Sequence, residues 1–290
     1  MNKLAAVMRL TRIEHSIMLV IAVVAAELIV GQLPSPYIIL LSLVAPISIS
    51  MGAFAINDYF DVAADRANGR TDRPIVNGSI GKKEALRISL ACTAVGIASS
   101  LFINIYAFSI AAIFGILAFL YAYKLKGMLI LGNAYIALSM VIPFIYGSYV
   151  AASGVNANII LISFVIFLSG FAREIHGMIR DYAGDVKERH VKNLVYHIGT
   201  ARSAYLAAIL YVEAIAISLF MFILKLPFQY NLAYLAPIMV VDAMLFYVAI
   251  GYMRVKNTRS FFKLSRNLSL GAMALALVIY LIVPLLYIPI

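Results

Sequence analysis

Long apolar segments, separated by short polar ones, occupy almost the whole chain. Several of them approach or reach the roughly 20 residues that a helix needs to cross a bilayer. We expect nine such helices, at residues 15–31, 37–57, 85–103, 107–123, 128–151, 157–172, 201–224, 231–252 and 267–289. The run from Ile88 to Tyr123 is too long for one crossing, so we divide it at Asn104. Without that division the count is eight.

The composition is that of a membrane protein. Of the 290 residues, 64% are hydrophobic and only 12% are charged, which is far from the composition of a soluble domain. We expect an all-α integral membrane protein with one domain over residues 1–290, a helix bundle with a central cavity, and cytosolic cap loops. The single cysteine, Cys92, excludes an intrachain disulfide and a zinc site built from cysteines.

Lysine and arginine residues indicate the orientation. In the nine-helix arrangement, 22 of the 23 Lys and Arg residues lie in the N-terminus or in 58–87, 124–127, 173–202 and 254–266, and Lys225 lies on the opposite side. Cytoplasmic loops carry an excess of these residues. We therefore expect a multi-pass protein of the cell membrane whose basic face meets the cytoplasm. This topology accounts for the net charge of +10, so nucleic acid is not an expected partner.

Two acidic clusters lie where apolar segments end. The first reads NDYFDVAAD at 57–65 and the second reads DYAGD at 181–185. Their polar members are Asn57, Asp58, Asp61 and Asp65 in the first cluster, and Asp181 and Asp185 in the second. On a helix, each set of aspartates shares one face. Clustered carboxylates repel unless cations lie between them, and Mg²⁺ commonly joins carboxylates to substrate phosphates. The clusters predict a magnesium–pyrophosphate site.

Basic side chains accompany both clusters and can meet anionic groups. They are Arg66, Arg70, Arg73, Lys82 and Lys83 after the first cluster, and Arg180, Lys187, Arg189 and Lys192 around the second. Any one of them is compatible with a positive-inside charge alone. Their proximity to the carboxylates favours a binding site.

The first cluster and its following loop resemble a known signature. NDYFDVAADRANGRTDRPI at 57–75 is similar to the NDxxDxxxD motif, followed by an Arg-Pro-Ile element, of the intramembrane UbiA-type prenyltransferases. DYAGD resembles the second Asp-rich motif of that family, and the resemblance covers nearly the whole chain. Within the family, Arg173–Glu174–Ile175 and the NDYFDV wording look most like archaeal digeranylgeranylglyceryl phosphate synthases.

This resemblance implies an enzyme that uses Mg²⁺ to move a geranylgeranyl group from its diphosphate to the sn-2 hydroxyl of geranylgeranylglyceryl phosphate, with release of pyrophosphate. The expected partners are thus a prenyl diphosphate donor, a phosphorylated lipid-alcohol acceptor and membrane lipid. The implied metal ligands are Asp58, Asp61, Asp65, Asp181 and Asp185, and all of these except Asp65 are also the implied catalytic residues. The implied substrate-binding residues are Asn57, Asp65, Arg66, Arg70, Arg73, Lys82, Tyr121, Lys124, Lys126, Arg173 and Glu174.

The chain departs from the family pattern at several positions. Met178 and Arg180 stand where the second motif often has acidic residues, which implies that fewer side chains bind metal there. In YAYKLK, neither Tyr121 nor Tyr123 has a lysine four residues later. We prefer Lys126 as the lysine that binds phosphate.

Other functions stay open from the sequence. A prenyltransferase of the same family could use hydroxybenzoate or naphthoate, although the surplus of basic residues favours a second phosphate. A transporter would also have buried acids, a helix with a proline such as Pro143 and paired halves. Carboxylates at helix ends, rather than at mid-membrane breaks, suit a metal–phosphate site better. The DGxxAR…GxxxD…D pattern of CDP-alcohol phosphotransferases is absent.

Overall fold

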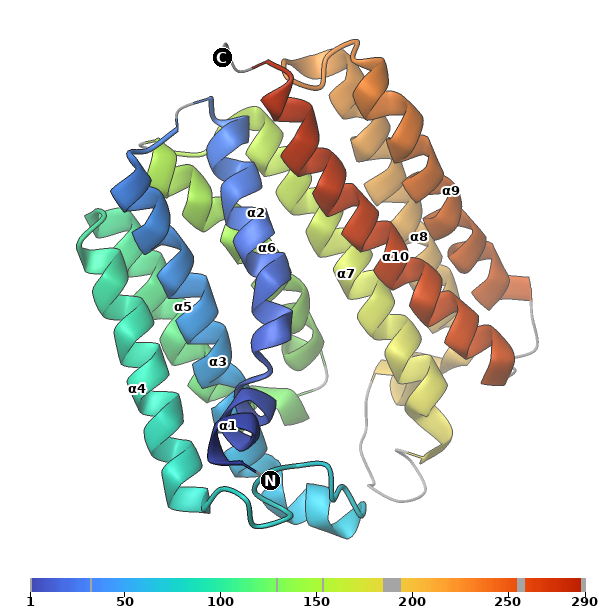
Figure 1. Cartoon of the computed structure of the whole chain (residues 1–290). Helices are drawn as coiled ribbons and strands as arrows, with labels where there is room; N and C mark the ends of the chain where they lie inside the picture. Colours follow the sequence, from blue (N-terminus) through green and yellow to red (C-terminus); the bar gives the residue numbers. More distant parts are fainter. Residues whose placement is uncertain are drawn as a thin grey trace.

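The regular elements of the protein are helices throughout the part of the chain that the structure describes (Figure 1). This structure, a computed structural model, describes residues 2–31, 33–128, 130–152, 154–184, 194–254 and 259–287. In chain order the elements are α1 (Lys3–Thr11), the 3-10 helix η1 (Ile13–His15), α2 (Ser16–Ile29), α3 (Pro36–Ala67), α4 (Lys82–Leu101), α5 (Ile105–Tyr123), the 3-10 helix η2 (Leu125–Gly127), α6 (Leu131–Ala151), α7 (Ala157–Gly184), α8 (Leu194–Leu224), α9 (Leu232–Arg254) and α10 (Arg259–Leu285).

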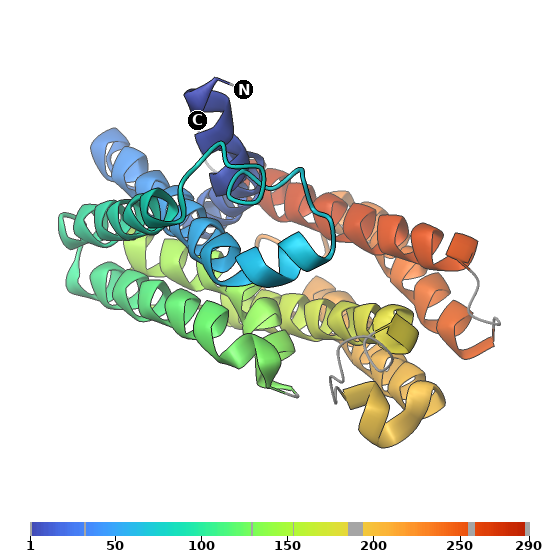
Figure 2. The same cartoon turned by 90° about the horizontal axis from the view of Figure 1, so that it is seen from below.

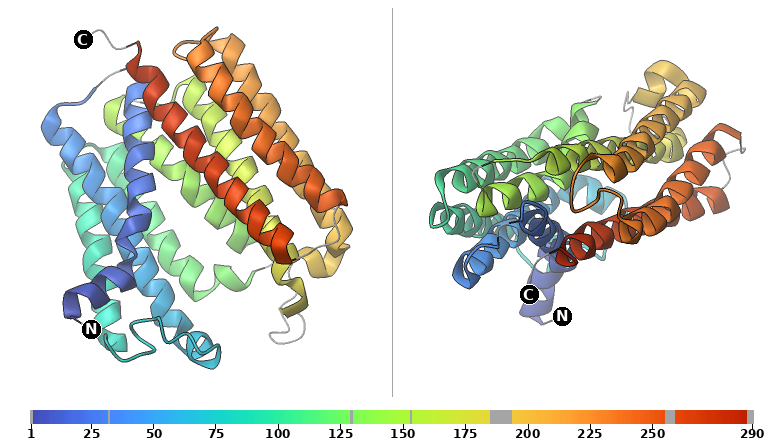
Figure 3. Two further views of the ribbon diagram at one scale, coloured as in Figure 1. Left: turned by 45° about the vertical axis from the view of Figure 1, so that its right-hand side comes forward. Right: turned by 90° about the horizontal axis from the view of Figure 1, so that it is seen from above.

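Helices α2 to α10 form a bundle that closes on itself. Each packs against the next helix in the chain, and α10 packs against α2 (Figures 1 and 3). The nine predicted segments therefore correspond to nine helices within the described residues. The division at Asn104 is also confirmed, because its side chain caps α5 by accepting a hydrogen bond from the Ala107 amide at 2.8 Å. Helix α1 was not predicted, since its nine residues are too short to give a membrane signal.

The bundle belongs in a membrane. Eight helices of the described chain, α3 to α10, are long and apolar enough to cross a bilayer, whereas α2 has only 14 residues. Large apolar side chains point outward, among them Leu90, Ile116, Val212 and Phe246. So much exposed apolar surface is unusual for a soluble monomer. In a membrane, lipid tails would cover this surface. The chain is a multi-pass membrane protein.

Helices α3 and α7 are longer than a bilayer requires. At 1.5 Å per residue, their 32 and 28 residues span about 48 and 42 Å, against a hydrocarbon core of about 30 Å. Their last turns can therefore lie beyond the apolar layer, where charged side chains are tolerated. The first acidic cluster lies near the end of α3, and Asp181 of the second cluster lies in the last turn of α7.

A close crossing fixes α3 against α4. A Cβ atom on Gly52 of α3 would lie 2.3 Å from the Thr93 Oγ1 atom of α4, so only glycine fits without movement. Ser89 Oγ also donates a hydrogen bond to the Gly52 carbonyl at 2.7 Å. Small residues at such crossings let membrane helices approach closely. The crossing holds α3 six residues before Asp58, and so helps to place the first cluster.

Basic residues gather at one end of the bundle. The N-terminal segment, the connection 68–81, the end of α7 and the start of α10 all lie there, whereas the connection from α8 to α9, which contains Lys225, lies at the other end (Figure 1). Seen from below, the connection 68–81 crosses the charged end beside α1 (Figure 2).

This arrangement predicts that Lys83 and Lys263 are accessible from the same side of the membrane and Lys225 from the other. All three side chains are exposed. Single cysteines can be placed at these positions in a Cys92→Ser background and treated with a thiol reagent that does not cross membranes. Positions 83 and 263 should be labelled in the same preparation, either intact cells or inverted vesicles, and position 225 in the other. Labelling of positions 83 and 263 from opposite sides would contradict the topology.

Candidate active site

Asp58 is the centre of the first cluster and is only 2% exposed. Arg12 Nη2 donates a hydrogen bond to its Oδ1 atom at 2.7 Å, and Arg73 Nη1 donates to Oδ1 and Oδ2 at 3.1 and 3.3 Å. Arg73 Nε also lies 3.6 Å from Asp65 Oδ2. A buried carboxylate is costly unless it is paired in this way. Asp58 thereby joins the junction of α1 and η1, helix α3 and the connection 68–81.

Arg12 is a residue of the candidate site that the sequence analysis did not predict. It ends α1 in the left-handed region, at φ 46° and ψ 50°, which is uncommon for a residue other than glycine and often marks a functional site. Its guanidinium group lies over the Phe54 ring, 4.7 Å from the centroid. Its position before the first apolar segment indicated only that a positive charge lies there. Nothing in the sequence pairs it with Asp58, 46 residues away.

Asp61 has a different set of partners. Asn57 Nδ2 donates a hydrogen bond to Asp61 Oδ2 at 3.0 Å, and the Lys126 ammonium group forms an ion pair with the same oxygen. Lys126 Nζ also donates to Asn57 Oδ1 at 3.3 Å. Lys126 lies in η2, and this turn carries its side chain back to α3. Lys124, by contrast, ends α5 with an exposed side chain.

The remaining predicted residues near the first cluster are more exposed. Arg70 donates two hydrogen bonds to the Asp72 carboxylate, at 2.9 and 3.0 Å. These bonds hold the pKa of Asp72 below its usual range. The Lys82 ammonium group lies over the Tyr59 ring at 4.6 Å, and Arg66 is exposed at the end of α3.

The second cluster is described only in part. Arg180 donates two hydrogen bonds to Asp181, at 2.7 and 2.6 Å, and Arg173 Nη1 lies 3.6 Å from Glu174 Oε1. Asp185 lies outside the described residues, as do Lys187, Arg189 and Lys192. Among the side chains that are described, no group of three acidic, His or Cys residues is arranged to hold a metal ion. Protein cations neutralise these carboxylates instead.

A cavity of about 940 Å³ connects the two motif helices. At the charged end it is lined by Arg12 and Asn57 from one side and by Arg173 and Arg180 from the other. The other lining residues are mostly apolar, from α2, α3, α5, α6, α7, α9 and α10. Tyr121 lines it and stacks on Tyr135, with ring centroids 4.7 Å apart. The site thus joins a charged mouth to an apolar interior.

Two acidic residues inside the bundle have structural partners. Ser42 Oγ donates a hydrogen bond to Glu27 at 2.7 Å, and Ser218 Oγ donates to Asp242 at 2.8 Å. These bonds join α2 to α3 and α8 to α9. Polar bonds of this kind contribute about 0.6 kcal/mol on average between membrane helices. The pairs therefore have a role in packing.

Comparison with known proteins agrees with this architecture. Residues 18–271 match the UbiA prenyltransferase family. A digeranylgeranylglyceryl phosphate synthase from Archaeoglobus fulgidus is 34% identical over 279 residues, which cover 95% of this chain and 94% of the relative. A protein of the same name from Korarchaeum cryptofilum is 30% identical and covers 78% of this chain and 79% of its own.

Solved structures extend the likeness to three dimensions. One, described as a study of digeranylgeranylglyceryl phosphate synthase in membranes, has a TM-score of 0.82 at 29% identity and covers 98% of this chain and 99% of its own. A UbiA homolog from Archaeoglobus fulgidus bound to GPP and Mg²⁺ has a TM-score of 0.65 at 18% identity and covers 95% of this chain and 99% of its own. The second likeness shows the fold alone.

The two aspartate networks should differ in their effect on stability. We expect Asp58→Asn to destabilise the protein by about 3–5 kcal/mol, because two partly buried guanidinium groups lose their counterion. Asp61→Asn should cost under about 1 kcal/mol, since its Lys126 partner is 42% exposed and solvent screens the pair. Thermal unfolding of both variants in one detergent measures the difference. An equal or smaller loss of Tm in Asp58→Asn would contradict the proposed pairing.

Proposed function

The chain belongs to the UbiA prenyltransferase family, and we propose that it transfers a geranylgeranyl group from geranylgeranyl diphosphate to the sn-2 hydroxyl of geranylgeranylglyceryl phosphate. Its named relatives place it among the prenyltransferases of archaeal ether-lipid synthesis. The observation that carries the specific proposal is the 34% identity to a named synthase over 95% of the chain. Pyrophosphate is the second product.

The large cavity suits a substrate with one apolar and one charged end. Its volume of about 940 Å³ is near the upper end of the roughly 300–1,000 Å³ typical of ligand sites. A prenyl chain in the apolar interior would place its diphosphate at the mouth, between α3 and α7. There Arg173, Arg180 and Lys126 supply positive charge, while the surrounding helices exclude water from the reacting carbon.

The donor atoms of the first acidic cluster are compatible with Mg²⁺. They are carboxylate and amide oxygens, which hard cations prefer, and Asp61 and Asp65 are 24% and 14% exposed at their side chains. We propose that Asp58, Asp61 and Asp65 of α3 and Asp181 of α7 hold the metal, with Asp185 as a further ligand on the sequence pattern. When bound, Mg²⁺ would neutralise the diphosphate and stabilise departing pyrophosphate.

Protein side chains would carry the rest of the reaction. Lys126 and Arg73 would transfer part of their ion pairing from carboxylates to phosphate oxygens as the diphosphate binds. Loss of pyrophosphate gives C1 allylic-cation character, and the faces of Tyr121, Tyr135 and Phe54, which line the cavity, can stabilise it by roughly 0.5–2 kcal/mol each. The acceptor hydroxyl then needs no strong base, because its proton is lost late to a carboxylate or to pyrophosphate.

We propose that the charged end faces the cytoplasm. The described segments that are rich in lysine and arginine, namely the N-terminal segment, the connection 68–81 and the start of α10, lie at that end of the bundle, and the positive-inside rule assigns such segments to the cytoplasm. Soluble pyrophosphate would then be released on the cytoplasmic side, where the charged groups of both substrates would also bind.

Competition between acceptors tests the proposed reaction. Purified protein with geranylgeranyl diphosphate and Mg²⁺, given equal amounts of geranylgeranylglyceryl phosphate and 4-hydroxybenzoate, should alkylate the phosphorylated lipid in strong preference. The physical reason is that the mouth has more cationic side chains than one diphosphate with Mg²⁺ requires, so that some can bind the phosphate of the acceptor. Preferential alkylation of 4-hydroxybenzoate would refute the proposed acceptor, and only the assignment to the family would stand.

A further inference from the structure

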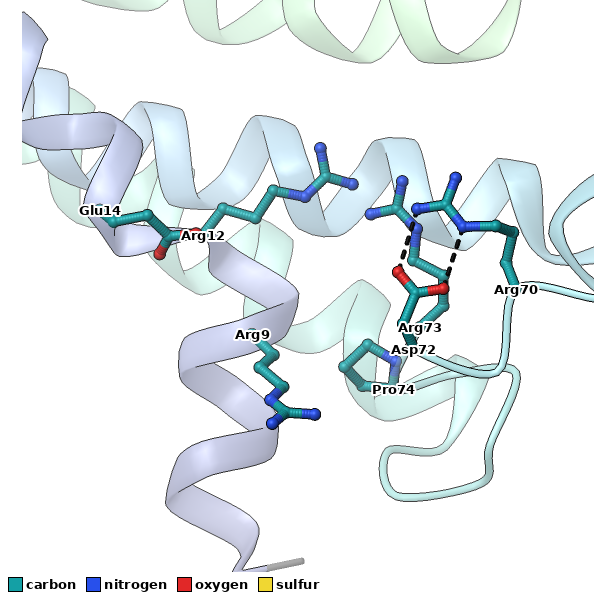
Figure 4. Close-up of a pocket in the computed structure, with 7 residues that line it drawn as sticks. All are labelled: Arg9, Arg12, Glu14, Arg70, Asp72, Arg73 and Pro74. Carbon is teal, nitrogen blue, oxygen red and sulfur yellow. Dashed lines mark hydrogen bonds and ion pairs between the residues drawn. The ribbon is translucent and has the colours of Figure 1, made fainter.

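A second, smaller cavity of about 400 Å³ lies beside α1 (Figure 4), and two of its lining residues, Arg12 and Arg73, form ion pairs with Asp58. It is lined by Arg9, Arg12, Glu14, Arg70, Asp72, Arg73 and Pro74. These residues come from α1, η1 and the connection 68–81, and none comes from α7 or from the two aspartate motifs. We call this cavity the arginine pocket.

The charge and geometry of the arginine pocket suit an anionic ligand. Four guanidinium groups line it against two carboxylates. Figure 4 shows the Asp72 carboxylate among these groups, held by both hydrogen bonds from Arg70. A carboxylate in a guanidinium fork has the geometry that a phosphate oxygen pair adopts. Arg9, on α1, lines the pocket with an exposed side chain.

The arginine pocket adjoins the proposed reaction site. Arg12 lines both this pocket and the large cavity, and Arg12 and Arg73 also hold Asp58. A phosphate in the pocket would therefore lie within one arginine side chain of the first acidic cluster. The remainder of the same molecule could pass Arg12 into the apolar cavity.

We propose that the arginine pocket binds the phosphomonoester of the acceptor lipid, with Arg9 and Arg70 as the residues that select for it. This proposal rests on the proposed function and assigns the acceptor phosphate to a site separate from the donor diphosphate. In the free protein Asp72 occupies Arg70, and the incoming phosphate displaces it. The donor diphosphate belongs at the large cavity, which is lined by Asn57 of the first motif and by Lys126, the partner of Asp61; neither residue lines the arginine pocket.

Paired acceptors isolate the effect of the phosphate. Rates are measured with geranylgeranylglyceryl phosphate and with geranylgeranylglycerol, for wild type, Arg9→Gln, Arg70→Gln and the control Arg202→Gln. Arg202 is exposed on α8 and lines neither cavity. Loss of a charge-assisted hydrogen bond should lower kcat/KM for the phosphorylated acceptor about tenfold and leave the dephosphorylated acceptor and the donor KM unchanged. An equal loss with both acceptors would overturn the proposal.

Asp72→Asn should act in the opposite direction, because it frees Arg70 and removes a negative charge. Its KM for the phosphorylated acceptor should fall severalfold, whereas a rise would show that Asp72 merely positions Arg70 and would contradict the displacement.

Binding without turnover separates this proposal from the proposed function. sn-Glycerol 1-phosphate should raise the Tm of wild type and Arg202→Gln but not of the Arg9→Gln/Arg70→Gln double variant, whereas pyrophosphate with Mg²⁺ should stabilise all three. Inorganic phosphate and phosphatidylglycerol vesicles are the comparison ligands. Stabilisation by the phosphodiester lipid alone, or by glycerol phosphate in the double variant, would overturn the assignment even if 4-hydroxybenzoate were a poor acceptor.

Discussion

The charged end of this protein depends on the neutralisation of one buried carboxylate. Asp58 is 2% exposed and would be prohibitively costly as an isolated charge. Arg12 and Arg73 pair with it from segments before and after α3. The same contacts close the N-terminal segment and the connection 68–81 over the end of the bundle, and they shape both the mouth of the large cavity and the arginine pocket.

Bilayer thickness accounts for the location of this network. Charged groups are expensive in the hydrocarbon layer, and α3 and α7 extend beyond it by several turns. The same helices line the apolar cavity within the layer. A single pair of helices therefore connects an apolar cavity to a charged mouth, which is the combination that the proposed transfer of a prenyl group between lipids needs.

Sequence reasoning predicted most of the fold because hydrophobic segment length is a strong local signal. It placed nine segments on nine helices, and the turn at Asn104 was readable from a single polar residue in an apolar run. The short α1 gave no such signal. Motif residues could be proposed from local spacing, but their partners could not: Arg12 meets Asp58 only through a left-handed turn, and Asp61 meets Lys126 across 65 residues.

The dependence of pyrophosphate release on Mg²⁺ tests whether the acidic clusters form a metal–diphosphate site. Purified protein with geranylgeranyl diphosphate and geranylgeranylglyceryl phosphate should release no pyrophosphate in EDTA and should recover on addition of Mg²⁺. Asp61→Asn should need a several-fold higher Mg²⁺ concentration for half-maximal release, because one metal ligand is weakened. Equal release in EDTA and in Mg²⁺, or an unchanged Mg²⁺ requirement in Asp61→Asn at wild-type rates, would contradict the metal site.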